Sequence, residues 1–312
     1  MLNSAPLILD IKGNALDDGP GIRSVVFFKG CLLDCQWCHN PESISRTAEI
    51  SFESQKCLGR ASCEAACEKT CSQQAISHAR TNLIDRDRCT LCYQCVDACP
   101  STAIAQVGEP MSVDDLYQKL VKYKPFYDSS GGGVTLSGGE PTLHMDYVSA
   151  LLKKLKAQGI HTLLQTCGLF PFDKFMARLY PWLDAIYFDL KLYDDQRHRD
   201  YCGTSNKVIL SNFVKLQALS LEGGVELLAR TPLVPGKTDS ESNLKAIASF
   251  LKQHKVTHIE LVRYNPIWHD KRTKLGYQDK SESAEALKKW MSQTSIDQCE
   301  AIFHDAGLLT QK

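Results

Sequence analysis

Short apolar segments alternate with longer amphipathic ones along most of the chain. Residues 24–30 (SVVFFKG) are β-branched and aromatic and end in glycine, a pattern that predicts a buried strand. Further strands are predicted at 132–139, 161–168, 185–191, 225–231, 258–264 and 299–305. Between them, helical periodicity predicts helices at 112–123, 145–158, 207–221, 240–254 and 283–291. This alternation predicts an α/β fold with a parallel sheet and helices outside it.

One segment, residues 50–107, breaks the alternation. It is rich in cysteine and poor in apolar periodicity, which predicts a small inserted domain held together by metal rather than by a hydrophobic core. Residues 1–49 and 108–312 remain, and their length is the usual one for a barrel of β/α units. Because six or seven strands can be counted rather than eight, we predict a partial (β/α)6 TIM-like barrel. A doubly wound open sheet is the alternative.

The composition is that of an ordinary globular protein. Of 312 residues, 43% are hydrophobic and 23% are charged, which argues against disorder, collagen or coiled coil. Basic and acidic residues each number 36, so nothing in the net charge favours a nucleic-acid partner. No apolar run approaches the roughly 18 residues of a transmembrane helix, and the N-terminal residues lack the basic region of a secretory signal. We therefore expect a cytoplasmic protein with no membrane partner.

Cysteine is the unusual component, with 14 residues. Disulfides do not persist in a reducing cytosol, so dense cysteine there indicates metal binding or catalysis. Eleven of the 14 lie between Cys31 and Cys99. The other three, Cys167, Cys202 and Cys299, show no ligand spacing and are interpreted as structural thiols.

The first cysteine group follows the first predicted strand with the spacing Cys31-x3-Cys35-x2-Cys38. Three thiolates on one short loop can bind three irons of a 4Fe–4S cluster and leave the fourth iron without a protein ligand. Such an open position can bind a substrate, as the open position of a catalytic zinc does. The alternative is a zinc loop that takes a distant fourth ligand.

The second group, Cys89-x2-Cys92-x2-Cys95-x3-Cys99-Pro100, has the spacing of bacterial ferredoxins. Its partner run is irregular, with Ser72 where proline is usual, and it consists of Cys57, Cys63, Cys67 and Cys71. Eight ligands suffice for two 4Fe–4S clusters, so we predict a ferredoxin-like insert at 50–107. Since the fourth cysteine of each run ligates the other cluster in such proteins, the expected sets are Cys57, Cys63, Cys67 with Cys99, and Cys89, Cys92, Cys95 with Cys71.

Polar motifs follow several predicted strands, at the edge where α/β barrels place their active sites. Each alone could be a turn or a solvated strand end. Together they lie on the same rim as the first cysteine loop and predict a binding site. The motifs are Ser137-Gly138-Gly139-Glu140-Pro141, Thr166-Cys167-Gly168, Asp189-Leu190-Lys191, Arg230, and Tyr264-Asn265.

With these motifs the chain resembles the radical S-adenosylmethionine (SAM) enzymes that activate glycyl radical enzymes, the pyruvate formate-lyase activating enzyme-like family. The resemblance rests on the cysteine loop with His39 and Asn40, on the strand-end motifs, and on the stretch Asp18-Gly19-Pro20-Gly21-Ile22-Arg23. These run in family order from residue 18 to about 265. The insert resembles that of the subgroup that serves dehydratases, decarboxylases and C–N or C–S lyases.

The resemblance implies a role for each motif. The first cysteine loop would hold the catalytic cluster, whose open iron chelates the methionine part of SAM. The partner's glycine loop would face Asp18, Gly19, Pro20 and Gly21. The implied SAM-binding residues are Trp37, Cys38, His39, Gly138, Gly139, Glu140, Asp189, Leu190, Lys191, Arg230 and Asn265, the last of which is often His in the family.

The implied activity is reductive cleavage of SAM to a 5′-deoxyadenosyl radical, which takes a hydrogen atom from a glycine Cα of the partner enzyme. The implied cofactors are three 4Fe–4S clusters and SAM, and the electron donor would be a flavodoxin or a ferredoxin-type protein. One alternative is a radical SAM enzyme that acts on a small molecule. A ferredoxin-type electron carrier is another alternative, but it explains only Cys57 to Cys99.

Overall fold

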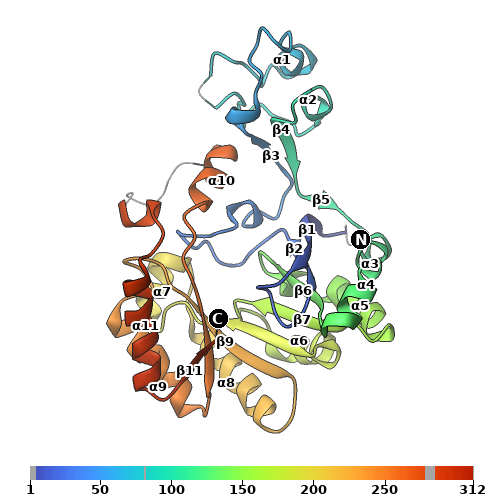
Figure 1. Cartoon of the computed structure of the whole chain (residues 1–312). Coiled ribbons are helices and arrows are strands. Elements are labelled where there is room, and N and C mark those ends of the chain that lie inside the picture. The colour runs from blue at the N-terminus through green and yellow to red at the C-terminus, as the bar shows by residue number, and fades with distance from the viewer. Residues whose placement is uncertain (1–4, 81, 278–284, 312) are drawn as a thin grey trace.

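The computed structural model describes residues 5–80, 82–277 and 285–311, and its centre is a largely parallel sheet (Figure 1). Over these residues the strand order is β11-β10-β9-β8-β7-β6-β2-β1-β5, and every neighbouring pair from β2 to β11 is parallel. The strands are β1 (Leu7–Ala15), β2 (Arg23–Phe28), β5 (Glu109–Pro110), β6 (Gly133–Gly138), β7 (His161–Thr166), β8 (Ala185–Asp189), β9 (Glu226–Pro232), β10 (His258–Val262) and β11 (Leu309–Gln311). The predicted α/β class with a parallel sheet is confirmed.

Helices connect successive strands and cover the sheet (Figure 1). They are α3 (Val113–Val121), α4 (Lys124–Ser130), α5 (Met145–Ala157), α6 (Phe172–Arg178), α7 (Asp195–Cys202), α8 (Lys207–Leu221), α9 (Glu241–Gln253), α10 (Trp268–Lys274) and α11 (Gln293–Asp305). The main core lies between them and the strands, where Val134, Leu164, Ile186 and Ile259 are almost fully buried. Among the described residues, no helix combines the length and apolar character needed to cross a membrane.

Two sequence predictions at the C-terminal end need correction. The strand predicted at 299–305 is the second half of α11, because Ile296, Cys299 and Phe303 are buried at helical spacing and Ser292 caps the helix. The last strand is β11 instead. Of the helix predicted at 283–291, residues 283–284 lie outside the described residues, and the remainder contains a 3₁₀ turn at Glu285–Lys288.

The cysteine-rich segment projects from the main body at the top of Figure 1. It contains an antiparallel pair, β3 (Glu49–Phe52) and β4 (Ile104–Val107), and two short helices, α1 (Ala66–Thr70) and α2 (Gln94–Asp97). A small separate cluster of buried residues includes Ile50, Ile76, Ile84 and Ile104 together with Cys67 and Cys95. Cys67 and Cys95 therefore belong to the interior of this segment, whereas Cys92 is exposed.

Candidate active site

The first cysteine loop is held from two sides by backbone hydrogen bonds. On one side the Cys31 amide donates to the Ile44 carbonyl (3.1 Å). On the other, the amides of Asp34 and Gln36 donate to the last carbonyls of α7, Cys202 and Tyr201, both at 3.0 Å. Gly30, just before the loop, has a φ of +105°, which glycine adopts without the strain that a side chain would bring. The three thiols of the loop are thus fixed relative to the ends of β2 and α7.

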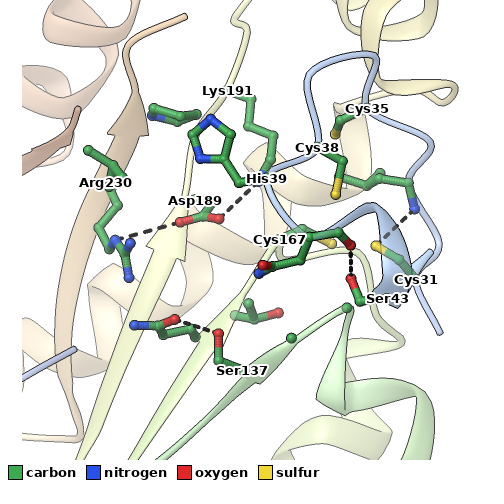
Figure 2. Close-up of a pocket in the computed structure, with 18 of the residues that line it drawn as sticks. Cys31, Cys35, Cys38, His39, Ser43, Ser137, Cys167, Asp189, Lys191 and Arg230 are labelled. Carbon is green, nitrogen blue, oxygen red and sulfur yellow. Dashed lines mark hydrogen bonds and ion pairs between the residues drawn. The ribbon is translucent and has the colours of Figure 1, made fainter. Parts of the chain in front are cut away.

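These thiols open onto a cavity of about 200 Å³ at the carboxyl ends of the strands (Figure 2). Ten predicted site residues line it: Cys31, Cys35, Trp37, Cys38, His39, Gly138, Gly139, Asp189, Lys191 and Arg230. The other described lining residues are Leu33, Asn40, Ser43, Ser137, Gln165, Thr166, Cys167, Pro232 and Val262. The structure therefore brings most of the predicted site together, from the cysteine loop and the ends of β6, β8 and β9, and β7 and β10 complete the described lining.

Three predicted site residues are not among those that line the cavity. The Glu140 side chain is fully buried behind it: one carboxylate oxygen accepts from the hydroxyls of Thr142 (2.7 Å) and Thr166 (2.9 Å), and the other accepts from the Cys167 amide (2.8 Å). Leu190 is buried in the main core. The Asn265 side chain accepts a hydrogen bond from the Ile267 amide at 3.0 Å.

The two glycines after β6 are required for close packing. A Cβ on Gly139 would lie 2.1 Å from the Gly30 carbonyl oxygen, and one on Gly138 would lie 2.3 Å from the Phe28 amide nitrogen. The Gly139 and Glu140 amides already donate to the Phe28 and Gly30 carbonyls, both at 2.8 Å. Because an ammonium group only donates, a hydrogen bond of this turn with it would be accepted by the carbonyl oxygens.

A row of charged side chains crosses the opposite wall of the cavity. Lys191 Nζ lies 2.9 Å from an Asp189 oxygen, and Arg230 Nε lies 3.8 Å from Asp189 and 3.3 Å from Glu260. Burial alone would raise the pKa of Asp189, but Lys191 and Arg230 lower it. Burial would likewise lower the pKa of Lys191, but Asp189 raises it above its ordinary value. The carboxyl of Asp189 and the ammonium of Lys191 are therefore both charged at neutral pH.

The surroundings of the loop shift the pKa values of its thiols and of its histidine. Burial raises the pKa of Cys31 to about 12 and also raises that of Cys38, while a hydrogen bond with Cys202, together with burial, raises that of Cys35. Burial, with Lys271 and Lys191 nearby, lowers the pKa of His39 to about 4. Within the described part of the chain, His39 Nε2 is buried without a hydrogen-bond partner. An unpaired buried nitrogen and three convergent thiols fit a thiolate-bound cluster with a polar ligand beside it.

Two residues beside the cavity were not predicted from the sequence. Gln165 accepts a hydrogen bond from Ser137 (2.6 Å) and donates to Asp18 (3.3 Å), so it links the cavity to the Asp18–Gly21 loop. Glu260 pairs with Arg230. Side chains two residues apart on a strand point to the same face. Gln165 lies two residues before Cys167 and Glu260 two residues before Val262, and both Cys167 and Val262 line the cavity. This alternation could have identified Gln165 and Glu260 from the sequence.

The Asp18–Gly21 loop is braced from the floor of the sheet. Arg23, fully buried, donates to the Pro20 carbonyl (3.0 Å) and to the Thr135 hydroxyl (2.7 Å). Thr135 in turn donates to the Asp18 carbonyl at 2.8 Å. Burial lowers the pKa of Arg23 to about 10, so the guanidinium stays charged at neutral pH. The predicted partner-facing loop therefore has a defined position next to the cavity.

Inside the insert the eight remaining ligand candidates gather around two small cavities. One is lined by Cys57, Cys63, Cys67 and Cys99, and the other by Cys71, Cys89, Cys92 and Cys95. No three His, Cys, Asp or Glu side chains of the described residues converge closely enough to hold a single metal ion. The fourth cysteine of each run lies with the first three of the other, which is the grouping that cross-ligation of two clusters requires.

The radical SAM superfamily matches residues 86–246 of this chain. The chain belongs to this superfamily. It is 39% identical over 263 residues to the isethionate sulfite-lyase activating enzyme of Nitratidesulfovibrio vulgaris, covering 83% of this chain and 84% of that protein. It is 34% identical to the (2S)-3-sulfopropanediol dehydratase activating enzyme of Klebsiella oxytoca, covering 98% of this chain and 97% of that one. The radical SAM protein is thus a glycyl-radical-enzyme activating enzyme, an activase.

The activase also shares its fold with a solved radical SAM methyltransferase from Sphaerobacter thermophilus. The TM-score is 0.54 and the sequences are 13% identical, over 98% of this chain and 76% of the other. This likeness concerns the fold alone. Membership of the family implies a 4Fe–4S cluster, SAM, and a glycyl radical enzyme as the partner.

Proposed function

We propose that Cys31, Cys35 and Cys38 hold the catalytic 4Fe–4S cluster of the activase and that SAM occupies the cavity beside it. The observation that carries this proposal is the convergence of three thiols, a glycine turn and a row of charged groups on one cavity of about 200 Å³. When bound and reduced, this pair supplies a 5′-deoxyadenosyl radical that removes a hydrogen atom from a glycine Cα.

The residues of the chain supply binding, orientation and charge for that chemistry. Lys191 and Arg230 present cations to the SAM carboxylate, while Asp189 between them can accept from ribose hydroxyls. The carbonyl oxygens of Gly138 and Gly139 can accept hydrogen bonds from the ammonium group of SAM. His39, neutral and buried, offers one unpaired nitrogen to the bound molecule.

The partner would approach over the Asp18–Gly21 loop, next to the cavity. In this loop the Asp18 carboxylate accepts a hydrogen bond from the side-chain amide nitrogen of Gln165. The amide oxygen of Gln165 accepts a hydrogen bond from Ser137 in the cavity wall. The glycine of the partner has to enter as an exposed loop, because a Cα–H bond buried in a folded core cannot reach the cavity. The partner is therefore a protein whose glycine loop can leave its own active site.

For the rest of the molecule we propose a partial (β/α)6 barrel at 1–49 and 108–312 and a ferredoxin-like domain with two 4Fe–4S clusters at 50–107. The seven parallel strands in one row support the barrel. The two cavities with four cysteines each support the two clusters, which would bring the total to three. A flavodoxin or ferredoxin-type donor in the cytoplasm would supply electrons.

The direct test follows deuterium from the glycine Cα of the partner into the 5′-deoxyadenosine that forms from SAM. Reconstituted, reduced activase is mixed with SAM and with a candidate glycyl radical enzyme labelled with deuterium at glycine Cα. The expected results are a glycyl radical signal in the electron paramagnetic resonance (EPR) spectrum and deuterium in the 5′-deoxyadenosine formed. SAM cleavage that yields unlabelled 5′-deoxyadenosine with every candidate, but labelled product with a deuterated small molecule, would overturn the proposal. Anaerobic reconstitution should give about twelve irons per chain.

A further inference from the structure

The two halves of the first cysteine loop are held in different ways. The first half is fixed by backbone hydrogen bonds to Ile44 and to the end of α7. The second half, residues 38–42, is contacted by side chains of residues 264–277, a segment that contains α10, and Figure 1 shows α10 between the main body and the insert. His39 and Asn40 of this half line the cavity proposed for SAM, here called the SAM cavity. Their position therefore depends on side-chain contacts.

Two lysine side chains hold the end of this half. Lys271 of α10 donates to Asn40 Oδ1 (2.9 Å) and to Glu42 Oε1 (2.7 Å). Lys29, whose side chain is fully buried, donates to the backbone carbonyl of Glu42 (2.6 Å). Within the described residues, the second carboxylate oxygen of Glu42 is buried without a hydrogen-bond partner. Lys271 therefore pairs with a mostly buried carboxylate and ties it to Asn40 in the wall of the SAM cavity.

His39 lies against an aromatic ring from the same segment. The Tyr264 ring meets the His39 ring edge-on, with centroids 5.5 Å apart and an interplanar angle of 61°. Tyr264 is buried, and its hydroxyl donates to the Leu287 carbonyl (2.6 Å) and accepts from Trp268 Nε1 (2.6 Å). Because these hydrogen bonds fix the hydroxyl, the ring is a rigid surface behind His39. The motif Tyr264-Asn265 thus contacts the site through its tyrosine, whereas the sequence predicted Asn265.

The same segment is anchored at its other end to the insert. The paired strands β3 and β4 form the stem of the insert. Arg86 donates to the Ile50 carbonyl of β3 (2.7 Å) and to the Lys274 carbonyl at the end of α10 (3.3 Å). Lys274 Nζ lies 3.0 Å from a carboxylate oxygen of Glu53, which directly follows β3. Residues 264–277 therefore connect the stem to the cysteine loop.

Contacts of Glu49 join the stem to the sheet and to the loop. Glu49 accepts from the Tyr277 hydroxyl and lies 2.5 Å from Lys29 Nζ. Lys29 also donates to Glu42, which Lys271 contacts from α10. A buried lysine paired with a carboxylate is costly to separate. A helix of seven residues is not stable by itself, so these contacts at both ends fix the position of α10.

From these contacts we propose that Lys271 is a positioning residue for SAM binding and that the stem of the insert anchors the helix that carries it. With Tyr264 behind His39, Lys271 holds Asn40 at the wall of the SAM cavity before SAM arrives. Binding then does not have to order residues 38–42, and an ordering cost that would weaken affinity is avoided. The stem thus contributes to SAM affinity through contacts between protein side chains. This inference rests on the proposed function, which places SAM in this cavity.

Variants of Lys271 test its role at the loop. Lys271→Met removes both hydrogen bonds, whereas Lys271→Arg keeps a cation with several donors. In SAM cleavage by the reconstituted enzyme with dithionite, Lys271→Met should raise the KM for SAM at least about tenfold and lower kcat less than about threefold. Lys271→Arg should restore the KM to within about threefold of wild type. Lys245→Met, which removes an exposed ion pair on α9, is the control. Equal KM values in Lys271→Met and the control, or a loss confined to kcat, would overturn the proposal.

A variant at the stem tests the anchor without SAM. Lys274→Met breaks only the partly exposed pair with Glu53, so it also decides the matter if Lys271→Met does not fold. Hydrogen exchange of the reconstituted full-length protein, followed by mass spectrometry, should be at least about threefold faster at residues 38–43 in Lys274→Met than in Lys245→Met. Equal exchange in the two variants would refute the anchor. If wild-type protein does not bind SAM, the proposed function fails instead, and the exchange result still shows whether the stem holds the loop.

Discussion

The SAM cavity and the insert both gather cysteines, but different forces shape them. Around the SAM cavity the sheet and its helices build a large core, and the cysteine loop is fixed by backbone hydrogen bonds to Ile44 and to the end of α7. The insert has helices of five and four residues and a small core of its own. Such short helices are not stable by themselves.

Backbone strain shows the same difference. Of nine non-glycine residues with positive φ in the described chain, seven lie in the insert. They are Glu64, Ala65, Gln74, Leu83, Leu91, Tyr93 and Thr102. Each such residue costs on the order of 1 kcal/mol unless its surroundings compensate. The main body is thus stabilised by burial, whereas we expect the insert, with its small core, to depend on what its cysteines bind.

The largest expected effect separates the two regions by function. Cys38→Ala removes one of three ligands from the SAM cavity and should abolish SAM cleavage with every reductant, while about eight irons remain in the insert. Iron analysis and the yield of 5′-deoxyadenosine measure this. Cys299→Ala, a buried thiol on α11 far from both regions in sequence, should keep full activity. Residual cleavage in Cys38→Ala with dithionite would show that another group completes the cluster.

Removing iron should destabilise the insert and leave the stability of the main body unchanged. After chelation, the amides of 50–107 should lose hydrogen-exchange protection by a factor of about 10³, because a small metal-bound domain unfolds without its metal. Strands β6 to β9 should keep theirs, since their core needs no metal. Exchange followed by mass spectrometry resolves the two regions. Simultaneous loss of protection in both would mean that the main body also depends on the clusters for stability.

The packing of the glycine turn gives an intermediate effect. Gly139→Ala places a Cβ 2.1 Å from the Gly30 carbonyl oxygen, so β6 must move away from the cysteine loop. We expect SAM binding, measured by calorimetry, to weaken at least tenfold and stability to fall by about 1–3 kcal/mol. Gly236→Ala, where a Cβ meets nothing within 4 Å although φ is +71°, is the control for replacing a glycine without a backbone clash. Equal SAM affinities in the two variants would contradict the packing argument.

The smallest effect concerns pH and the main body alone. Burial would raise the pKa of Asp184, but Lys156 at 2.6 Å and the Thr162 amide at 2.8 Å lower it below its ordinary value. The carboxylate therefore stabilises the fold above its unfolded pKa of about 3.9, and that contribution is lost as pH falls through the folded pKa. Asp184→Asn should cost about 1 kcal/mol at pH 7.

Exchange protection of β7 and β8 measures that cost at several pH values. The gap between wild type and Asp184→Asn should narrow as pH falls below the unfolded pKa of about 3.9 and should close only below the lowered folded pKa, where both side chains are neutral. In the insert the two proteins should behave alike at every pH. A gap that persists unchanged to pH 3 would show that shape rather than charge matters at this position.

Local signals in the sequence predicted most of the fold. The strands from 132–139 to 258–264 were found because each is apolar and bounded by turn residues. The segment 299–305 was assigned wrongly, since a short apolar run fits strand or helix equally well until its neighbours at Ile296 and Ser292 are included. Strand β1 was missed because polar residues such as Asp10, Lys12 and Asn14 alternate along an exposed edge.

Site residues were predictable from the sequence where a single motif contains them. They were not predictable where residues that contact one another come from different strands. Cysteine spacing alone located the thiols. The importance of Gln165 depends on Ser137 and Asp18, which only the folded sheet brings together. Leu190 was included because it lies between Asp189 and Lys191, although alternation along a strand turns it to the opposite face. The burial of Leu190 in the core follows from this two-residue alternation.

The stem of the insert bears on how such an enzyme could arise. Glu49 and Val107 are direct partners across β3 and β4, so the chain leaves the main body and returns to it within one interstrand spacing of about 5 Å. A hairpin turn of two residues could close that gap. A single insertion or deletion at this point could therefore add or remove the whole cysteine-rich module without rearranging the sheet.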